Sequence, residues 1–241
     1  MQKRLDVYLS ENNTVKSRSL AASLIKQGSV EVNGRICTKA SFAVDENDNI
    51  RIIGEMPKYV GRGGLKLEKA LSHYRLHLDG SVCIDIGAST GGFTDCMLQN
   101  GAVKVYSVDV GTDQLDEKLR NDPRVVSMEK TDIRNCVGAL PAVDFIGIDV
   151  SFISLKLVLS SAYALLKDGG ECVALIKPQF EAGKSHLSKH GIVRDSKVHK
   201  KVCDDISEFA STLGFERGEV ISSPITGGDG NTEYLIYLRR L

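Results

Sequence analysis

The chain has 241 residues, of which 42% are hydrophobic and 26% charged, and its formal net charge is zero. This length suits a small domain followed by a medium one, and this composition is typical of a folded globular protein. The apolar runs fall far below the roughly 18 residues that a membrane helix needs, and the basic N-terminus lacks the apolar stretch of a secretory signal. These totals favour a cytoplasmic protein.

Charge is unevenly distributed along the chain. Residues 1–44 hold seven Lys and Arg against three acids, and residues 177–201 hold seven against two. Acidic residues concentrate in 79–149. This charge pattern predicts that the two basic segments bind an anionic macromolecule and that the acidic segment between them binds a cationic or hydroxyl-rich ligand. Ordinary solvated faces are the alternative.

Cysteine and histidine patterns give no metal site. The six cysteines form no CxxC pair, so they are interpreted as small buried side chains in a reducing compartment. His186 and His190 are four residues apart, but no third ligand stands at a motif spacing. A solvated loop is therefore favoured over a zinc site, and we expect no metal.

Residues 1–57 predict a small α+β module. Two short helices come first, and the second runs from the N-cap candidate Ser17 to Gly28. A strand, a tight Asn33-Gly34 turn and a second strand follow, and a further strand is expected over 48–53. Basic residues gather on the second helix and the turn.

This module resembles the S4 RNA-binding domain through the phrases RLDVYLSENN and SRSLAASLIKQGSVEVNGR. In that family the second helix and the following turn grip RNA phosphates, a contact that positive side chains on a rigid surface can make. A generic basic mini-domain is the alternative. The resemblance implies RNA-binding roles for Lys3, Arg4, Lys16, Arg18, Lys26 and Arg35.

A second, larger domain is predicted over 64–241, after a Gly-rich linker at 58–63. In it, apolar runs alternate with helical patterns. This alternation predicts an α/β fold with a parallel sheet covered on both faces, where ligands bind at the carboxyl ends of the strands. Strands are expected over 82–86, 103–108, 125–128, 143–149, 171–176 and 233–238, and helices over 64–76, 91–100, 152–167 and 198–213.

The first of these strands ends in DIGASTGGFTD, residues 85–95. Its glycines permit close approach to a ligand, but their spacing is not GxGxxG, and Asp85 would repel a phosphate. Asp109 ends the second strand and suits ribose hydroxyls, while Asp132 follows the third and suits an adenine amino group. Two alternatives for this loop are an NAD-binding site and a purely structural turn that binds no ligand.

The acids around this loop fit S-adenosylmethionine, which carries a sulfonium, an ammonium and a ribose but no phosphate. The combination resembles the motif of class I methyltransferases. The candidate cofactor-binding residues are Asp85, Gly87, Ala88, Ser89, Gly91, Gly92, Phe93, Asp109, Asp132 and Asp149.

Four further polar residues stand near the same sheet edge. Asp149 and Lys177 end the fourth and fifth strands, and Glu233 begins the last. Lys66 lies on the entering helix, where its neighbours Leu65 and Leu67 are expected to pack in another direction. These four resemble the Lys-Asp-Lys-Glu tetrad of FtsJ-type RNA 2′-O-methyltransferases. Ordinary strand-end ion pairs are the alternative.

The whole chain resembles the TlyA (hemolysin A-like) family, through YVGRGGLKLEKAL, CIDIGASTGGFTD, IDVSFISL, LIKPQFEAGK and GNTEYL. The resemblance implies a class I, Rossmann-like fold with a seven-stranded, mostly parallel sheet. It also implies S-adenosylmethionine-dependent methylation of cytidine 2′-hydroxyls in ribosomal RNA, with Lys177 as base or alkoxide stabiliser. Arg62, Lys184, Lys189 and Arg194 join the RNA-binding candidates.

Finer expectations follow from the same resemblance. Only residues 1–4 precede the first apolar positions, which in that family favours 23S over 16S RNA. The phrase DVSF lacks the prolines of many amine methyltransferases, which favours an oxygen acceptor. A non-catalytic RNA-binding protein and a membrane-acting hemolysin are the alternatives, and the absence of tryptophan speaks against the latter. We expect a monomer.

Overall fold

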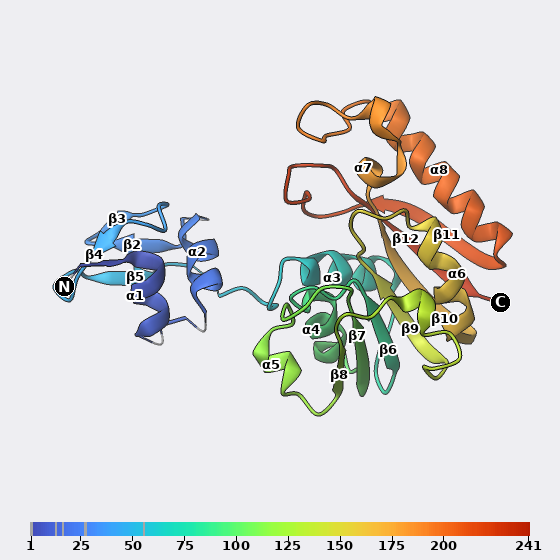
Figure 1. Cartoon of the computed structure of the whole chain (residues 1–241), viewed down its shortest axis with the longest axis horizontal. Coiled ribbons are helices and arrows are strands. Elements are labelled where there is room, and N and C mark those ends of the chain that lie inside the picture. The colour runs from blue at the N-terminus through green and yellow to red at the C-terminus, as the bar shows by residue number, and fades with distance from the viewer. Residues whose placement is uncertain (1, 13, 16, 27, 55) are drawn as a thin grey trace. The chain divides into compact units, whose positions relative to one another are not determined.

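The computed structural model describes residues 2–12, 14–15, 17–26, 28–54 and 56–241. The chain divides into two compact units, Met1–Met56 and Pro57–Leu241, and Figure 1 labels the elements of both. The first unit has one buried apolar cluster and the second has two, so each unit is described by itself.

The first unit joins two short helices to short antiparallel strands around a core that includes Leu5, Leu24 and Val30. One sheet has the order β3-β2-β5 and the other pairs β1 with β4. This is the predicted α+β arrangement. The elements are β1 (Lys3–Arg4), α1 (Leu5–Glu11), α2 (Arg18–Lys26), β2 (Val30–Val32), β3 (Arg35–Ile36), β4 (Ala43–Val44) and β5 (Ile50–Ile52).

Local sequence signals of this unit are confirmed. The Ser17 hydroxyl accepts a hydrogen bond from the Leu20 N–H at 3.2 Å, as expected at a helix start. Gly28, just after α2, has φ +76°, a conformation that glycine adopts without strain. Asn33 and Gly34 have φ +51° and +78°, as a two-residue type I′ hairpin turn requires.

Asp6 is a buried carboxylate at the start of α1, held by two arginines. Arg4 donates to both of its oxygens, at 2.9 and 3.0 Å, and Arg18 Nε donates to Oδ2 at 2.9 Å. The Arg4 hydrogen bonds lower the pKa of Asp6 to about 2, and Arg18 adds to this effect while burial opposes it. Two of the predicted RNA-binding residues therefore also stabilise the unit internally.

We predict that Asp6→Asn lowers the free energy of unfolding of this unit by about 1–3 kcal/mol, because hydrogen bonds to a charged acceptor are lost. Since the folded pKa is depressed, the stabilisation is present above the ordinary carboxyl pKa and lost as the pH falls through about 2. Hydrogen exchange of α1 and α2 in the full chain measures the loss. Exchange no faster than in Glu46→Gln, an exposed control, would contradict the prediction.

The second unit is a seven-stranded sheet with the order β11-β12-β10-β9-β6-β7-β8. All neighbours are parallel except β12, which is antiparallel to both β10 and β11. The predicted seven-stranded, mostly parallel sheet is confirmed. The strands are β6 (Val82–Ile86), β7 (Lys104–Val108), β8 (Val125–Met128), β9 (Val143–Ile148), β10 (Leu166–Ile176), β11 (Phe215–Ser222) and β12 (Tyr234–Arg240).

Helices cover both faces of this sheet. On one face α3 and α4 pack on Cys83, Phe145 and neighbouring side chains. On the other face α6 and α8 pack on Ile84 and Ile146, since side chains alternate along each strand. The helices are α3 (Gly63–Tyr74), α4 (Gly92–Gln99), α5 (Glu117–Arg120), α6 (Lys156–Leu165), α7 (Pro178–Glu181) and α8 (Ser196–Thr212), with 3-10 turns at Ile133–Asn135 and Lys184–His186.

The helix expected over 152–167 is wrong at both ends. Residues 152–155 form a loop in which Phe152 has φ +64°. Leu166 already pairs with Val143, so β10 begins five residues before the expected strand at 171–176. The apolar pattern continues across this boundary because both the end of the helix and the start of the strand are buried, so periodicity alone does not separate them.

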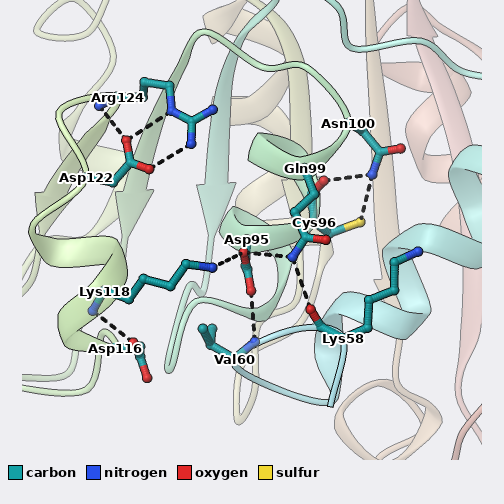
Figure 2. Close-up of polar contacts among 10 residues, drawn as sticks. All are labelled: Lys58, Val60, Asp95, Cys96, Gln99, Asn100, Asp116, Lys118, Asp122 and Arg124. Carbon is teal, nitrogen blue, oxygen red and sulfur yellow. Dashed lines mark hydrogen bonds and ion pairs between the residues drawn. The ribbon is translucent and has the colours of Figure 1, made fainter. Parts of the chain in front are cut away.

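The segment expected as a linker, 58–63, packs on the second unit. Tyr59 is buried in the cluster around α3 and α4. The buried carboxylate of Asp95, on α4, accepts hydrogen bonds from the Val60 N–H at 2.9 Å, the Gln99 amide at 3.0 Å and Lys118 Nζ at 3.3 Å. Figure 2 draws these contacts. This anchoring fixes the entry into α3, which carries Lys66.

Candidate active site

Three strands bring charged residues to one sheet edge. Asp149 directly follows β9, Lys177 directly follows β10, and Glu233 directly precedes β12. Because β12 runs antiparallel, its beginning lies at the edge where the parallel strands end. The pairing of Ile176 with Tyr234 places Lys177 and Glu233 one residue beyond the same rung.

These residues and Lys66 form a chain of alternating charges. Lys177 Nζ lies 2.6 Å from Asp149 Oδ1, and Lys66 Nζ lies 3.5 Å from Asp149 Oδ2. Lys66 Nζ lies 2.7 Å from Glu233 Oε2. Lys66 is 7% exposed, Lys177 8% and Glu233 3%, so each charge is balanced by a partner inside the protein. The structure therefore brings together all four residues of the predicted tetrad.

The packing of α3 differs from the sequence interpretation. Leu65, expected to pack, is 38% exposed, whereas Lys66 is buried beside Leu67. The ion pairs with Glu233 and Asp149 let the lysine occupy an interior position that hydrophobicity alone assigns to the leucine.

A pocket opens beside this chain of charges. It is lined by Lys177, Asp149, Asp85 and the predicted glycine-rich loop, together with Gly63 from α3. Gly87 has φ +83°, and a Cβ there would lie 2.6 Å from the Asp149 carbonyl oxygen. Only glycine therefore allows the loop after β6 to pass so close to the end of β9. Of the candidate loop residues, Gly87, Ala88, Ser89, Gly92 and Phe93 line the pocket.

Asp85, which lines this pocket, is fully buried. Thr94 donates to its Oδ2 through both the backbone N–H, at 2.9 Å, and the hydroxyl, at 2.6 Å. The other oxygen, Oδ1, has no hydrogen-bond partner among the described residues. Burial raises the pKa of Asp85 to about 7, while the Thr94 hydrogen bonds oppose the rise. A cationic ligand in the pocket would contact the unpartnered Oδ1 and stabilise the charged form of Asp85.

Three other candidates do not line the pocket. Asp109 accepts hydrogen bonds at 2.7 Å from the N–H groups of Ser89 and Gly111, which orders the loop after β7. Gly91, with φ +94°, packs its backbone against the side chain of Leu119. The Asp132 carboxylate is bound by its neighbour Arg134, whose hydrogen bonds lower its pKa.

The basic candidates lie mostly on the surface. Lys3 pairs with Glu11 at 2.6 Å, and Arg4 and Arg18 hold Asp6. Lys16 falls outside the described residues. The exposed remainder consists of Lys26 and Arg35 in the first unit and Arg62, Lys184, Lys189 and Arg194 in the second.

Sequence reasoning missed Ser151 and Thr94, whose side chains contact candidate residues that line the pocket. Ser151 accepts a 2.8 Å hydrogen bond from Lys177 Nζ and also lines the pocket. Its place two residues after Asp149, at a strand end, was a usable signal. Thr94 contacts Asp85 because α4 folds back over the strand, which the sequence pattern does not indicate. No group of three or more potential metal ligands occurs in the described ranges.

Family comparisons match both units of the chain. The sequence model of the FtsJ-like methyltransferase family matches residues 59–240, and that of the S4 domain matches residues 3–50. The chain is 41% identical to "Hemolysin A" of Brachyspira hyodysenteriae over 97% of this chain and 98% of that protein.

Several relatives carry names of RNA methyltransferases. "16S/23S rRNA (cytidine-2'-O)-methyltransferase TlyA" of Mycobacterium tuberculosis is 37% identical, over 98% of this chain and 89% of its own length. "23S rRNA (cytidine-2'-O)-methyltransferase TlyA" of Campylobacter jejuni is 34% identical, over 97% and 98%. A solved structure named "Putative hemolysin from Streptococcus thermophilus" is 45% identical, with a TM-score of 0.79 over 99% of this chain and 88% of that one.

We predict that Lys66→Met destabilises the second unit by about 3–5 kcal/mol, because it leaves the buried Glu233 carboxylate without its cation. The double variant Lys66→Met, Glu233→Gln should recover much of this loss, since no unpaired charge remains there. Urea unfolding measures both, with Lys69→Met on the exposed side of the same helix as the control. Equal destabilisation of the single and double variants would contradict the prediction.

Proposed function

Because this chain belongs to the family of FtsJ-like methyltransferases, we propose that it transfers the methyl group of S-adenosylmethionine to the 2′-hydroxyl of a cytidine in ribosomal RNA. The observation that carries the proposal is the chain of charges that runs from Lys177 through Asp149 and Lys66 to Glu233. It lies beside a pocket that the buried Asp85 lines. The names of the relatives from M. tuberculosis and C. jejuni support the substrate.

The pocket residues fit S-adenosylmethionine. When bound, this molecule supplies an electrophilic methyl group on a sulfonium. The buried Asp85 Oδ1, which lacks a partner among the described residues, would accept a hydrogen bond from the ammonium group. Asp109, at the end of β7, would accept ribose hydroxyls, and the glycine-rich loop allows close approach. S-adenosylmethionine carries no phosphate group, so these carboxylates would not repel it.

Lys177 is the residue that we assign to the acceptor hydroxyl. A ribose 2′-hydroxyl has a pKa far above neutrality, so attack needs a base or a positive charge beside the developing alkoxide. Lys177 lines the pocket, and Asp149 holds its amine at 2.6 Å. Lys66 pairs with Asp149, and Glu233 in turn balances the charge of Lys66, so that Asp149 stays in place to orient Lys177. Positioning of the hydroxyl for in-line attack supplies much of the remaining rate enhancement.

Ribosomal RNA of the large subunit is the favoured substrate, because 23S appears in the names of both the M. tuberculosis and the C. jejuni relatives whereas 16S appears in one. We propose that the S4 unit and the basic residues of 184–194 bind the RNA backbone. Such an enzyme would act where ribosomes assemble, which favours the cytoplasm.

A membrane-acting hemolysin is the alternative that the names of the B. hyodysenteriae relative and the S. thermophilus structure suggest. Within the described ranges, no helix has the length and apolar character to cross a bilayer. A dye-release assay with lipid vesicles separates the two functions, since the proposed enzyme should cause no leakage. A non-catalytic RNA-binding protein should show no rise in melting temperature with S-adenosylmethionine.

The proposal is tested by incubating ribosomal subunits with the protein and S-adenosylmethionine labelled in its methyl group. We expect 2′-O-methylcytidine in 23S RNA, and we predict that Lys177→Met lowers the rate by about 10²–10⁴-fold while cofactor affinity stays within a few-fold. Lys104→Met, at the opposite edge of the sheet, is the matched control.

Two outcomes would count against these assignments. If the wild-type protein methylates neither ribosomal RNA, the proposed function fails. If Lys177→Met retains the wild-type rate, only the role of Lys177 fails.

We further predict that Lys26→Ala and Arg35→Ala each weaken RNA binding and reduce the slope of log affinity against log salt by about 0.7–0.9, the value for one phosphate contact. These exposed residues are better probes than Arg18, whose loss would also disturb Asp6. Filter binding at several salt concentrations measures the slope. A slope equal to that of Lys104→Ala would show that the S4 unit does not anchor the RNA here.

A further inference from the structure

The short helix after Lys177 is joined to the loop after Asp149 by side-chain contacts. The helix is α7, Pro178–Glu181, and the loop covers residues 150–155. We propose that Glu181 is a positioning residue that fixes this loop, so that Ser151 stays in contact with Lys177. This inference rests on the proposed function, where Lys177 acts on the acceptor hydroxyl.

Glu181 holds the far end of the loop with both carboxylate oxygens. Oε1 accepts the Leu155 N–H at 2.6 Å, and Oε2 accepts the Ser154 hydroxyl at 2.7 Å. Leu155 immediately precedes α6, so the carboxylate also lies at a helix N-terminus, where negative charge is favourable. Both oxygens are engaged with the loop, which makes Glu181 a structural anchor rather than a group that touches substrate.

Ser151 contacts Lys177 at the near end of the same loop. Lys177 Nζ donates to the Ser151 hydroxyl at 2.8 Å and pairs with Asp149 at 2.6 Å. An ammonium group has three N–H donors, so these two partners leave one for the pocket that Lys177 lines. The direction of that donor depends on where the loop holds Ser151.

The middle of the loop is in a conformation that needs external support. Phe152 has φ +64°, which is unfavourable for a bulky side chain, and it is 91% exposed. The Phe152 ring packs against the ring of Phe180, on α7, with 5.1 Å between the two centroids, and this contact offsets part of the cost. A strained loop keeps one geometry only where its surroundings hold it, and Glu181 supplies that hold.

The position of Glu181 in α7 explains why losing its contacts with the loop would affect Lys177. Lys177 is the N-cap of this one-turn helix, and Glu181 is its last residue, four positions later. Lys177 Nζ contacts one end of the loop, at Ser151, and the Glu181 carboxylate contacts the other end. The helix therefore presents Lys177 and Glu181 to the two ends of one loop, and loss of the second contact would loosen the first.

A double-mutant cycle tests the proposal by methyl transfer to ribosomal RNA under single-turnover conditions. We expect Glu181→Ala to lower the rate by about 10- to 100-fold, with unchanged S-adenosylmethionine affinity, because a small misplacement of a catalytic group has this effect. Glu181→Gln keeps an acceptor for the Leu155 N–H and should recover part of the rate. In a Ser151→Ala background, Glu181→Ala should cause little further loss. Glu208→Gln, exposed on α8, is the control.

The outcomes separate this inference from the proposed function. A wild-type protein that transfers no methyl group overturns both. A full rate in Glu181→Ala, or losses that multiply in the double variant, overturns the positioning role alone. If Glu181→Ala does not fold, Ser154→Ala removes one of the two bonds and enters the same cycle with the same criteria.

Discussion

A row of alternating charges, buried at one edge of the sheet, is the constraint on which the second unit depends. Lys66 and Lys177 are almost as inaccessible as core residues, and each is tolerated only because a carboxylate lies within ion-pair distance. Asp149 contacts both lysines, so its position governs the whole row. Such an arrangement contributes little net stability, so its presence is better explained by the chemistry that we propose for it.

The sheet topology serves this row directly. A fully parallel sheet would place the start of β12 at the opposite edge, far from Asp149 and Lys177. Because β12 enters between β10 and β11 as an antiparallel strand, Glu233 arrives beside Lys177 one rung beyond the last paired residues. The anchored segment before α3, held by Asp95, then delivers Lys66 to the same place.

The same physical reasoning applies in the pocket and in the first unit, with opposite results for two buried acids. Asp6 is surrounded by arginine donors, and its pKa falls to about 2. Asp85 is more deeply buried and receives only neutral donors from Thr94, so its pKa rises to about 7. The first acid is satisfied within the protein, whereas the second has an oxygen left for a cationic ligand, as the proposed cofactor would provide.

The sequence by itself determined the two-unit organisation, most strand positions, the turn at Asn33-Gly34 and the strand-end places of Asp149 and Lys177, because turn chemistry, alternation and strand-end position are local signals. Lys66 and Glu233 joined the predicted tetrad through the family resemblance rather than through a local signal. Only the tertiary structure decided that Lys66 is buried while Leu65 is exposed, that residues 152–155 form a loop, and that Ser151, Thr94 and Glu181 support candidate residues. Apart from the strand-end position of Ser151, which was a usable signal, those facts depend on packing and contacts that local patterns do not encode.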